Sequence, residues 1–342
     1  VVCAVGKTVS DKIELLFASH QECKRGLKAG IVTSIVTATA TVRQLLNEIE
    51  EKFPSLRLNS AYVGVRGAHI SSLNNHGIYA ITRSDKEITT NDVIGVIENA
   101  KTIHLQNERV IIHTIPQDFT VDKEKGFSNP VGMEGSTIET DVHIITGNIS
   151  HLNNISKVIA NSGLNLIEHI YHAFPLAEVV ISNEEKQLGS ALIDIGDLLT
   201  SIVIYHDGKI KFSKEFSVGG FYITNDIACA LHVSYETAQS IKENYGYAMS
   251  SLIKSNREFE VVLIDRTTKK KLNEELLVEY IKPRLEEIIV FIKDEIKNSG
   301  YEDFINSIIL TGGGAALRGI NKAFEKVFKG KEVRYGIIPE NM

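Results

Sequence analysis

A carboxylate and a glycine turn follow one another near the middle of the chain. Asp194 lies in the apolar run 191–195, and Gly196 starts a turn that leads to Thr200. A carboxylate at a strand end can hold a magnesium ion, while N–H groups of a glycine turn can face phosphate. An edge turn with a solvated Asp has the same pattern, and Asp197 and Leu198 stand where a phosphate cradle favours glycines. This segment alone leaves both interpretations open.

A second candidate is the apolar run 308–310, followed by Thr311 and the three glycines Gly312, Gly313 and Gly314. Consecutive glycines let the backbone approach a flat ligand, and the N-terminus of a following helix favours anionic groups. The alternative is a tight connection from a strand to a helix. The pattern is more specific than an isolated GxG, and both interpretations remain open.

Two weaker candidates lie between these segments. Gly219 and Gly220 lead into a helix that contains Asn225, a pattern that a loop and a helix cap also produce. Lys242, three residues after Gln239, is within reach of a ribose or phosphate if its helix lines a site. A lysine on a helix surface is more often only solvated.

Other catalytic chemistry is not indicated. The histidines lack the paired spacing of a metal site, and the cysteines lie too far apart for a zinc or disulfide framework, which suggests a reducing compartment. No Ser/His or Cys/His pair has the local context of a nucleophile. The residues considered are His104, His113, His143, His169, His172, Cys3, Cys23 and Cys229.

Composition narrows the class of protein. The 342 residues include 37 Lys and Arg against 43 Asp and Glu, a net charge of −6, which gives no electrostatic reason to expect nucleic acid as a partner. No apolar stretch is long enough to span a bilayer, and there is no signal peptide. We expect a soluble, cytoplasmic protein of about two domains. Because the chain begins with Val1, we also expect both ends to be trimmed.

Several helices and strands are expected to position these residues. Helical spacing predicts a helix through residues 42–49 that Phe53 and Pro54 stop, and another over 90–101. Apolar residues predict a long helix over 276–297, which Pro283 should start or kink. Asp207 and Gly208 predict a hairpin turn. Hairpins that alternate with helices twice over predict an α/β protein of two related halves.

Taken in order, these motifs resemble the actin-like ATPase superfamily and, more narrowly, the FtsA family of bacterial cell-division proteins. The resemblance covers essentially the whole chain, from residues 25–32 and 63–70 to the glycine turn at 312–314. Its most specific part is 113–119 (HTIPQDF) with 129–133 (NPVGM). It implies a bilobed α/β actin-like fold with an inserted small α+β subdomain, and ATP with Mg²⁺ between the lobes.

The resemblance also implies subdomain boundaries and site residues. The first subdomain would span 1–66 and 142–188, and the inserted one 67–141. The second lobe would contain a nucleotide subdomain, 189–223 and 303–342, and an upper subdomain, 224–302. Cofactor contacts carry over to Asp194 (also the magnesium ligand), Gly196, Gly219, Gly220, Asn225, Gln239, Lys242, Gly312, Gly313 and Gly314.

The implied partners are those of a division adaptor. The family tethers the FtsZ ring to the inner face of the cytoplasmic membrane, recruits later division proteins and assembles into protofilaments. The tether is a C-terminal amphipathic helix that this chain does not contain. The FtsZ C-terminal peptide would bind the upper subdomain, where Lys282 and Arg284 can make charge-assisted bonds, although a helix Arg is more often a surface residue.

This chain departs from the family at the second phosphate loop. The family pattern Asp-Ile-Gly-Gly-Gly-Thr-Thr-Asp is replaced by residues 194–201, DIGDLLTS, and a Glu is expected where Gln239 stands. An added carboxylate repels a triphosphate, and leucines obstruct backbone donors. The first phosphate loop should precede Val1. We therefore expect at most a weak ATPase.

Four functions remain open. The first is a polymerising adaptor that binds ATP weakly, which the intact glycine turn and Lys242 favour. The second is a scaffold that needs no nucleotide. An active kinase or chaperone-type ATPase is disfavoured by the eroded loop, and a pilus-assembly adaptor is disfavoured by the segment 113–133. The site sequence further predicts that restoring glycines at 197 and 198 tightens ATP binding.

Overall fold

The computed structural model describes residues 1–10, 12–103, 105 and 108–338. His104 and the last four residues of the predicted nucleotide subdomain lie outside the described residues. The chain divides into two compact units. The first comprises Val1–Ile70, His104–His113 and Thr146–His172, and the second comprises Ser71–Ile103, Thr114–Ile145 and Ala173–Met342.

The first unit consists of short strand pairs and two helices. Its elements are β1 (Val2–Val9), β2 (Lys12–His20), β3 (Leu27–Lys28), β4 (Ile31–Val32), α1 (Ile35–Lys52), β5 (Ser60–Val65), α3 (Ile149–Asn161) and β10 (Asn165–Tyr171). The hydroxyl of Ser34 caps α1, and Phe53 ends it, as the sequence predicts. β1 pairs with β2, and β5 pairs with β10.

A cavity of about 630 Å³ lies between these strand pairs in the first unit. Residues 1–4 and 61–66 line two of its sides, and Leu45 of α1 and Val158 of α3 contribute apolar surface. In the described part of the chain no ladder joins β1 to β5. Each of these strands therefore has one edge without a strand neighbour.

The second unit contains what we call the insert, residues 71–103 and 114–145, and the second lobe, residues 173–338. The insert holds β6 (Ser71–Ala80), α2 (Thr90–Lys101), β8 (Glu124–Phe127) and most of β7 (Arg109–Val121) and β9 (Thr137–Asn148). It has its own apolar core of Ile81, Ile88, Val96, Phe119, Val121 and Ile138.

The second lobe alternates strands and helices. Its elements are α4 (Ala173–Val180), α5 (Asn183–Leu188), β11 (Ser190–Ile195), β12 (Thr200–His206), β13 (Lys209–Phe216), α6 (Gly220–Leu231), α7 (Tyr235–Tyr245), β14 (Glu258–Val262), β15 (Lys269–Asn273), α8 (Glu274–Asn298), β16 (Ser307–Thr311), α9 (Ile320–Val327) and β17 (Glu332–Tyr335), with short 3₁₀ turns at Ser250–Leu252, Glu302–Phe304 and Gly313–Ala316.

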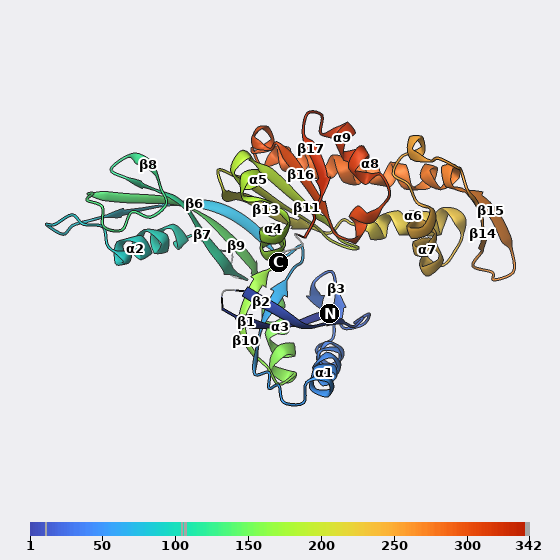
Figure 1. The fold of residues 1–342 in the computed structure, drawn as a ribbon, viewed down its shortest axis with the longest axis horizontal. Helices are drawn as coiled ribbons and strands as arrows, with labels where there is room; N and C mark the ends of the chain where they lie inside the picture. Colours follow the sequence, from blue (N-terminus) through green and yellow to red (C-terminus); the bar gives the residue numbers. More distant parts are fainter. Residues whose placement is uncertain (11, 104, 106–107, 339–342) are drawn as a thin grey trace. The chain divides into compact units, whose positions relative to one another are not determined.

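One sheet runs through the second unit. In the described residues it has nine strands in the order β17-β16-β11-β12-β13-β6-β9-β7-β8, so the insert continues the sheet of the second lobe (Figure 1). The predicted hairpin turn is confirmed, since Asp207 and Gly208 both have positive φ between β12 and β13. Helix α8 is confirmed as well, and it continues through Pro283.

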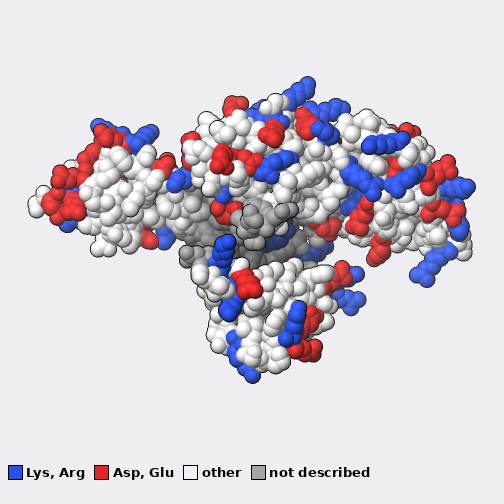
Figure 2. Space-filling model, in the orientation of Figure 1, with Lys and Arg blue, Asp and Glu red and all other residues white. Residues whose placement is uncertain are grey.

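Charges of both signs cover the second lobe. Figure 2 shows Lys and Arg side chains interspersed with Asp and Glu side chains on its visible face. Acidic side chains gather at the outer end of the insert in the same view. No helix in the described ranges combines the length and apolar character needed to cross a bilayer.

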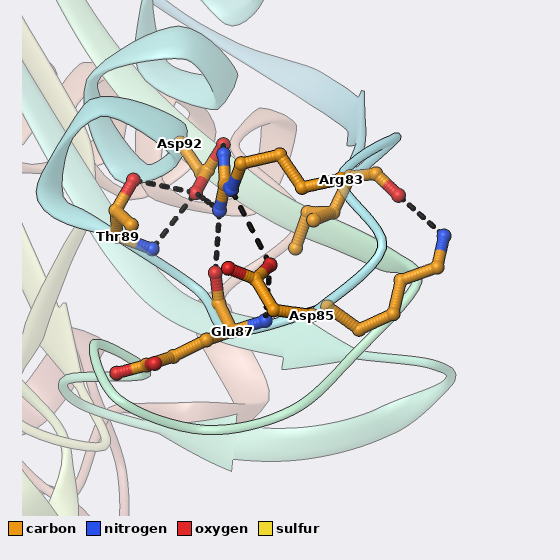
Figure 3. A network of polar contacts seen from close by, with 7 residues as sticks. Arg83, Asp85, Glu87, Thr89 and Asp92 are labelled. Carbon is orange, nitrogen blue, oxygen red and sulfur yellow. Dashed lines mark hydrogen bonds and ion pairs between the residues drawn. The ribbon is translucent and has the colours of Figure 1, made fainter.

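The start of α2 is held by one buried carboxylate (Figure 3). Asp92, with a side chain 2% exposed, accepts from Arg83 Nη2 at 2.7 Å. It also accepts from the Thr89 N–H at 2.8 Å and the Thr89 hydroxyl at 2.7 Å. These donors, Arg83 first, hold the pKa of Asp92 well below its usual range. The sequence predicted this helix, and the structure places its cap at Thr89 with Asp92 reaching back.

Replacing Asp92 by Ala should lower the free energy of unfolding by about 2–3 kcal/mol, because it leaves the Thr89 donors and Arg83 without this acceptor. Asp85→Ala is the matched control, since Asp85 lies 3.6 Å from Arg83 with a side chain 62% exposed. It should cost under about 0.5 kcal/mol. Equal urea midpoints for the two variants would contradict the assigned role of Asp92.

Candidate functional site

The end of strand β11 is the centre of the candidate site. All residues of β11 are buried, and β11 lies between antiparallel β12 and parallel β16. Asp194, which is 5% exposed, is in register with Ser201 on one side and with Thr311 on the other. Because β11 and β16 are parallel, their carboxyl ends reach the same edge of the sheet, where open α/β sheets bind ligands.

The turn after β11 packs against the start of α6. The Gly196 N–H donates to Leu199 O at 2.8 Å and closes the turn. Gly196 O accepts from the Gly220 N–H at 2.9 Å, and Asp197 O accepts from the Phe221 N–H at 2.8 Å. The first N–H groups of α6, which in other proteins are available to anions, are therefore bonded to this turn.

Glycine is required where these backbones meet. A Cβ on Gly219 would lie 2.4 Å from Asp197 O and 2.6 Å from Gly196 O. A Cβ on Gly312 would lie 2.4 Å from Asp194 Oδ1, and Gly312 has a φ of +86°. A Cβ on Gly314 would lie 2.5 Å from Ile195 Cγ2. Gly313 differs, because nothing lies within 4 Å of its Cβ position.

The helix does not begin directly after the glycines, where the sequence predicted its start. Gly313–Ala316 form one 3₁₀ turn, and α9 begins only at Ile320. The turn places Gly312 and Gly314 against β11 and leaves Gly313 facing open space. The N-terminus of an α-helix therefore does not lie at the glycines. A 3₁₀ turn lies there instead, and its hydrogen-bond geometry is poorer than that of an α-helix.

Lys242 is bonded to α6. Its Nζ donates to Thr224 Oγ1 at 2.6 Å and lies 3.3 Å from Gly220 O. Thr224 is fully buried, and its hydroxyl is 2.6 Å from Gln239 Oε1. Burial lowers the pKa of Lys242, while the nearby carboxylates Asp197 and Glu243 oppose that shift.

Asp197 adds a negative charge to this edge. Its side chain is exposed, and Tyr235 donates its hydroxyl to Asp197 Oδ1 at 3.3 Å. The Tyr235 ring stacks on Phe221 with 5.3 Å between centroids. Burial first, and the Asp197 charge second, raise the pKa of Tyr235. Asp197 is therefore held close to the start of α6 and to Lys242.

The structure brings most of the sequence-predicted residues together. Gly219, Gly220 and Lys242 meet at α6, and Gly312 and Gly314 meet Asp194 and Gly196 at the end of β11. Asn225 is exposed on α6, one residue from buried Thr224. Sequence reasoning missed Thr224 as the residue that joins Lys242 and Gln239. One sequence feature could have indicated it. Thr224 stands four residues after Gly220, the spacing at which a Thr hydroxyl in a helix donates to a backbone carbonyl, here Gly220 O.

Asp194 is the only magnesium ligand that the sequence predicted. Within the ranges that the structure describes, no three His, Cys, Asp or Glu side chains are grouped to hold a metal ion. A magnesium ion bound through one carboxylate takes its other ligands from phosphate and water. A magnesium ion at Asp194 would therefore need further ligands from a bound phosphate or from water.

Arg284, the predicted peptide contact, is paired within the second lobe. Its Nε lies 2.7 Å from Asp226 Oδ2, and its Nη1 lies 2.6 Å from Glu287 Oε2. The guanidinium lies 5.9 Å from the Tyr222 ring centroid. A pocket of about 250 Å³ adjoins it, lined by Val218, Tyr222, Arg284, Glu287, Ile288 and Phe291. Lys282, two residues earlier on the same helix, is exposed.

Comparison with solved structures defines the class. The PilM–PilN type IV pilus biogenesis complex matches with a TM-score of 0.66 at 15% identity, over 98% of this chain and 84% of that one. MreB5 of Spiroplasma citri bound to ADP matches with a TM-score of 0.56 at 14% identity, over 97% and 76%. At these identities the likeness shows the fold alone, which is the actin-like α/β fold.

Sequence comparison gives the family. The family model "SHS2 domain inserted in FTSA" matches residues 67–146, and "Cell division protein FtsA" matches 191–340. The cell division protein FtsA of Pseudomonas aeruginosa is 32% identical over 340 residues, 98% of this chain and 80% of that protein. FtsA of Escherichia coli K12 is 28% identical over 344 residues, 98% and 81%. The chain belongs to the FtsA family of cell-division proteins, as the resemblance predicted.

The glycines give a direct test of this geometry. Gly312→Ala should lower the free energy of unfolding by about 2–4 kcal/mol, because of its positive φ and the overlap with Asp194. Gly313→Ala is the matched control and should stay within about 0.5 kcal/mol of the parent chain. Denaturant titration measures both. A destabilised Gly313→Ala with an unaffected Gly312→Ala would contradict the arrangement of the turn.

Proposed function

We propose that this chain is a division adaptor that assembles into filaments and tethers the FtsZ ring to the inner face of the cytoplasmic membrane, where it recruits later division proteins. Family membership over nearly the whole chain, the inserted SHS2 domain included, carries this proposal. Membrane attachment would use a C-terminal amphipathic helix. Weak contacts repeated along a filament then hold FtsZ by multivalency.

We infer that ATP binding is weak. The observation that carries this inference is the bond from the Phe221 N–H to Asp197 O, which occupies a donor at the start of α6. The Asp197 carboxylate would repel a triphosphate, and Lys242 already has acceptors in Thr224 and Gly220. Open space at Gly313 suits a flat adenine ring, so the adenosine side fits better than the phosphate side.

A nucleotide would act here as a conformational ligand. Magnesium bound with ATP would neutralise phosphate charge beside Asp194, while Gly313 leaves room for the base. Lys242 would give up its hydrogen bond to Thr224 and contact the nucleotide instead. The energy of that exchange would couple ligand state to polymer state if filaments favour one conformation.

A scaffold without nucleotide is the second candidate. The contacts among Lys242, Thr224 and Gln239 favour it, because they give the Lys242 ammonium and the buried Thr224 hydroxyl their partners without a ligand. Filaments that form equally with and without ATP would support this candidate over the first.

Restoring glycines tests the nucleotide proposal. Asp197→Gly with Leu198→Gly should tighten ATP binding about tenfold, since it removes a repulsive charge and a bulky side chain. Calorimetry on the full-length protein, with and without Mg²⁺, measures the affinity. As a control, Asp207→Gly also removes one carboxylate, but from a hairpin turn elsewhere in the second lobe, and should leave ATP affinity unchanged. Unchanged ATP affinity in the double variant would show that Asp197 and Leu198 do not limit binding.

The proposed FtsZ contact is tested at α8. Charge reversal, Arg284→Glu, and the milder Arg284→Gln should each weaken binding of the FtsZ C-terminal peptide, by about tenfold for the neutral change. Lys282→Gln should weaken it less. Because Arg284→Glu meets Asp226 and Glu287, thermal melts must accompany the anisotropy titration.

Two controls accompany that test. Lys322→Gln removes a charge from an exposed pair on α9 and should leave peptide affinity unchanged. Asp226→Asn weakens the internal partner of Arg284 and should not reduce affinity. Peptide binding that is unchanged in folded Arg284→Gln would remove this residue from the dock.

A further inference from the structure

Four neighbouring strands of the large sheet carry polar side chains at one level. Asp194 of β11 is in register with Thr311 of β16 and with Ser201 of β12. Ser201 is in turn in register with Glu215 of β13. Register partners on adjacent strands point to the same face of a sheet, so these four side chains form a row across it. We call this set the polar row.

Three members of the polar row are almost fully buried. Asp194 is 5% exposed, Ser201 is 1% exposed and Glu215 is 3% exposed. The same face is apolar two residues further into the sheet, at Leu192 of β11 and Val203 of β12. Burial of a carboxylate is costly, and two carboxylates in one row repel each other unless a cation or hydrogen-bond donors compensate them. This edge of the sheet therefore favours a positively charged ligand.

Glu215 reaches the side chain at position 201. Ser201 Oγ donates to Glu215 Oε1 at 3.3 Å, so the carboxylate lies one hydrogen bond away from this position. The family pattern Asp-Ile-Gly-Gly-Gly-Thr-Thr-Asp ends with a carboxylate where this chain has Ser201. The carboxylate that the loop lacks at 201 is therefore present in the polar row, supplied by the neighbouring strand.

Thr311 gives an independent indication of a ligand at the polar row. Its hydroxyl oxygen is inaccessible to solvent and has no hydrogen-bond partner within the described residues. A buried hydroxyl without a partner costs free energy, which a bound water or ligand atom can recover. Gly312 follows directly, and a Cβ there would lie 2.4 Å from Asp194 Oδ1. The polar row thus borders the glycine turn at which the proposed function places a nucleotide.

We propose that Glu215 is a positioning residue for magnesium-bound ATP, and that it replaces the carboxylate missing at position 201. Magnesium is held in proteins by one or two carboxylates and keeps several water ligands, so Asp194 and Glu215 can both act on one ion, directly or through water. This inference rests on the weak ATP binding in the proposed function. It names the second acidic residue of that site.

Removal of the Glu215 charge tests the inference. Glu215→Gln keeps the length of the side chain and an acceptor for Ser201. It should weaken binding of ATP with Mg²⁺ about tenfold, because a carboxylate that attracts the cation is lost. It should not weaken binding of ATP without Mg²⁺, where the same carboxylate only repels phosphate. Calorimetry on the full-length protein measures both affinities, and thermal melts monitor the fold.

Two further variants separate positioning from a general charge effect. Asp197→Asn removes a carboxylate from the same edge, but from an exposed side chain outside the polar row, and should tighten ATP binding with and without Mg²⁺. The swap variant, Ser201→Asp with Glu215→Gln, returns the carboxylate to position 201. It should restore the affinity for ATP with Mg²⁺ to within about threefold of the parent.

The outcomes separate this inference from the proposed function. A folded Glu215→Gln that binds ATP with Mg²⁺ as tightly as the parent overturns the inference and leaves the proposed function intact. If Glu215→Gln does not fold, the swap variant decides, since it keeps two carboxylates in the polar row, and a tenfold loss of affinity in it overturns the inference. A parent that binds no ATP with or without Mg²⁺ contradicts the nucleotide proposal and this inference together.

Discussion

Three backbone segments approach so closely at the end of β11 that no side chain fits between them. The Gly219 backbone meets the carbonyls of Gly196 and Asp197, while Gly312 meets Asp194. This constraint sets where α6 starts relative to the sheet. Because α6 carries Thr224, it also sets the acceptor for Lys242. Close backbone contact thus determines the arrangement of the candidate site, including the positions of its polar side chains.

The same constraint explains how this edge of the sheet can be stable without a bound anion. Donors at a helix start need acceptors, and an anion is one source of them. Here the carbonyls of the turn after β11 supply acceptors to Gly220 and Phe221. The chain therefore satisfies its own backbone at the place where a nucleotide would contribute. Under the proposed function, Asp197 and Leu198 in place of glycines would therefore affect ligand affinity more than folding.

The sequence predicted those features that depend on local chemistry. The hairpin at Asp207 and the long helix α8 follow from turn geometry and spacing. For Gly312 the sequence indicated ligand contact or a tight connection, and the structure shows its close approach to Asp194. The role of Thr224 and the polar contacts between the insert and β13 were not predictable, because they depend on which elements lie side by side. His143 shows the limit clearly. Its lack of metal spacing was apparent in the sequence, but its partners Asn74 and Ser213 are about seventy residues away.

The candidate site and the insert belong to one sheet. Asp194 is in register with Ser201, and Ser201 is in register with Glu215, to which its hydroxyl donates at 3.3 Å. Lys214, the residue before Glu215 on β13, pairs with Ser71 of the insert. Two hydrogen-bonded ladders therefore connect the end of β11 to the strand that meets the insert. Coupling between distant sites needs an element with two arrangements, so under the proposed function the contact between β13 and β6 is the place where a change at the nucleotide edge would reach the insert.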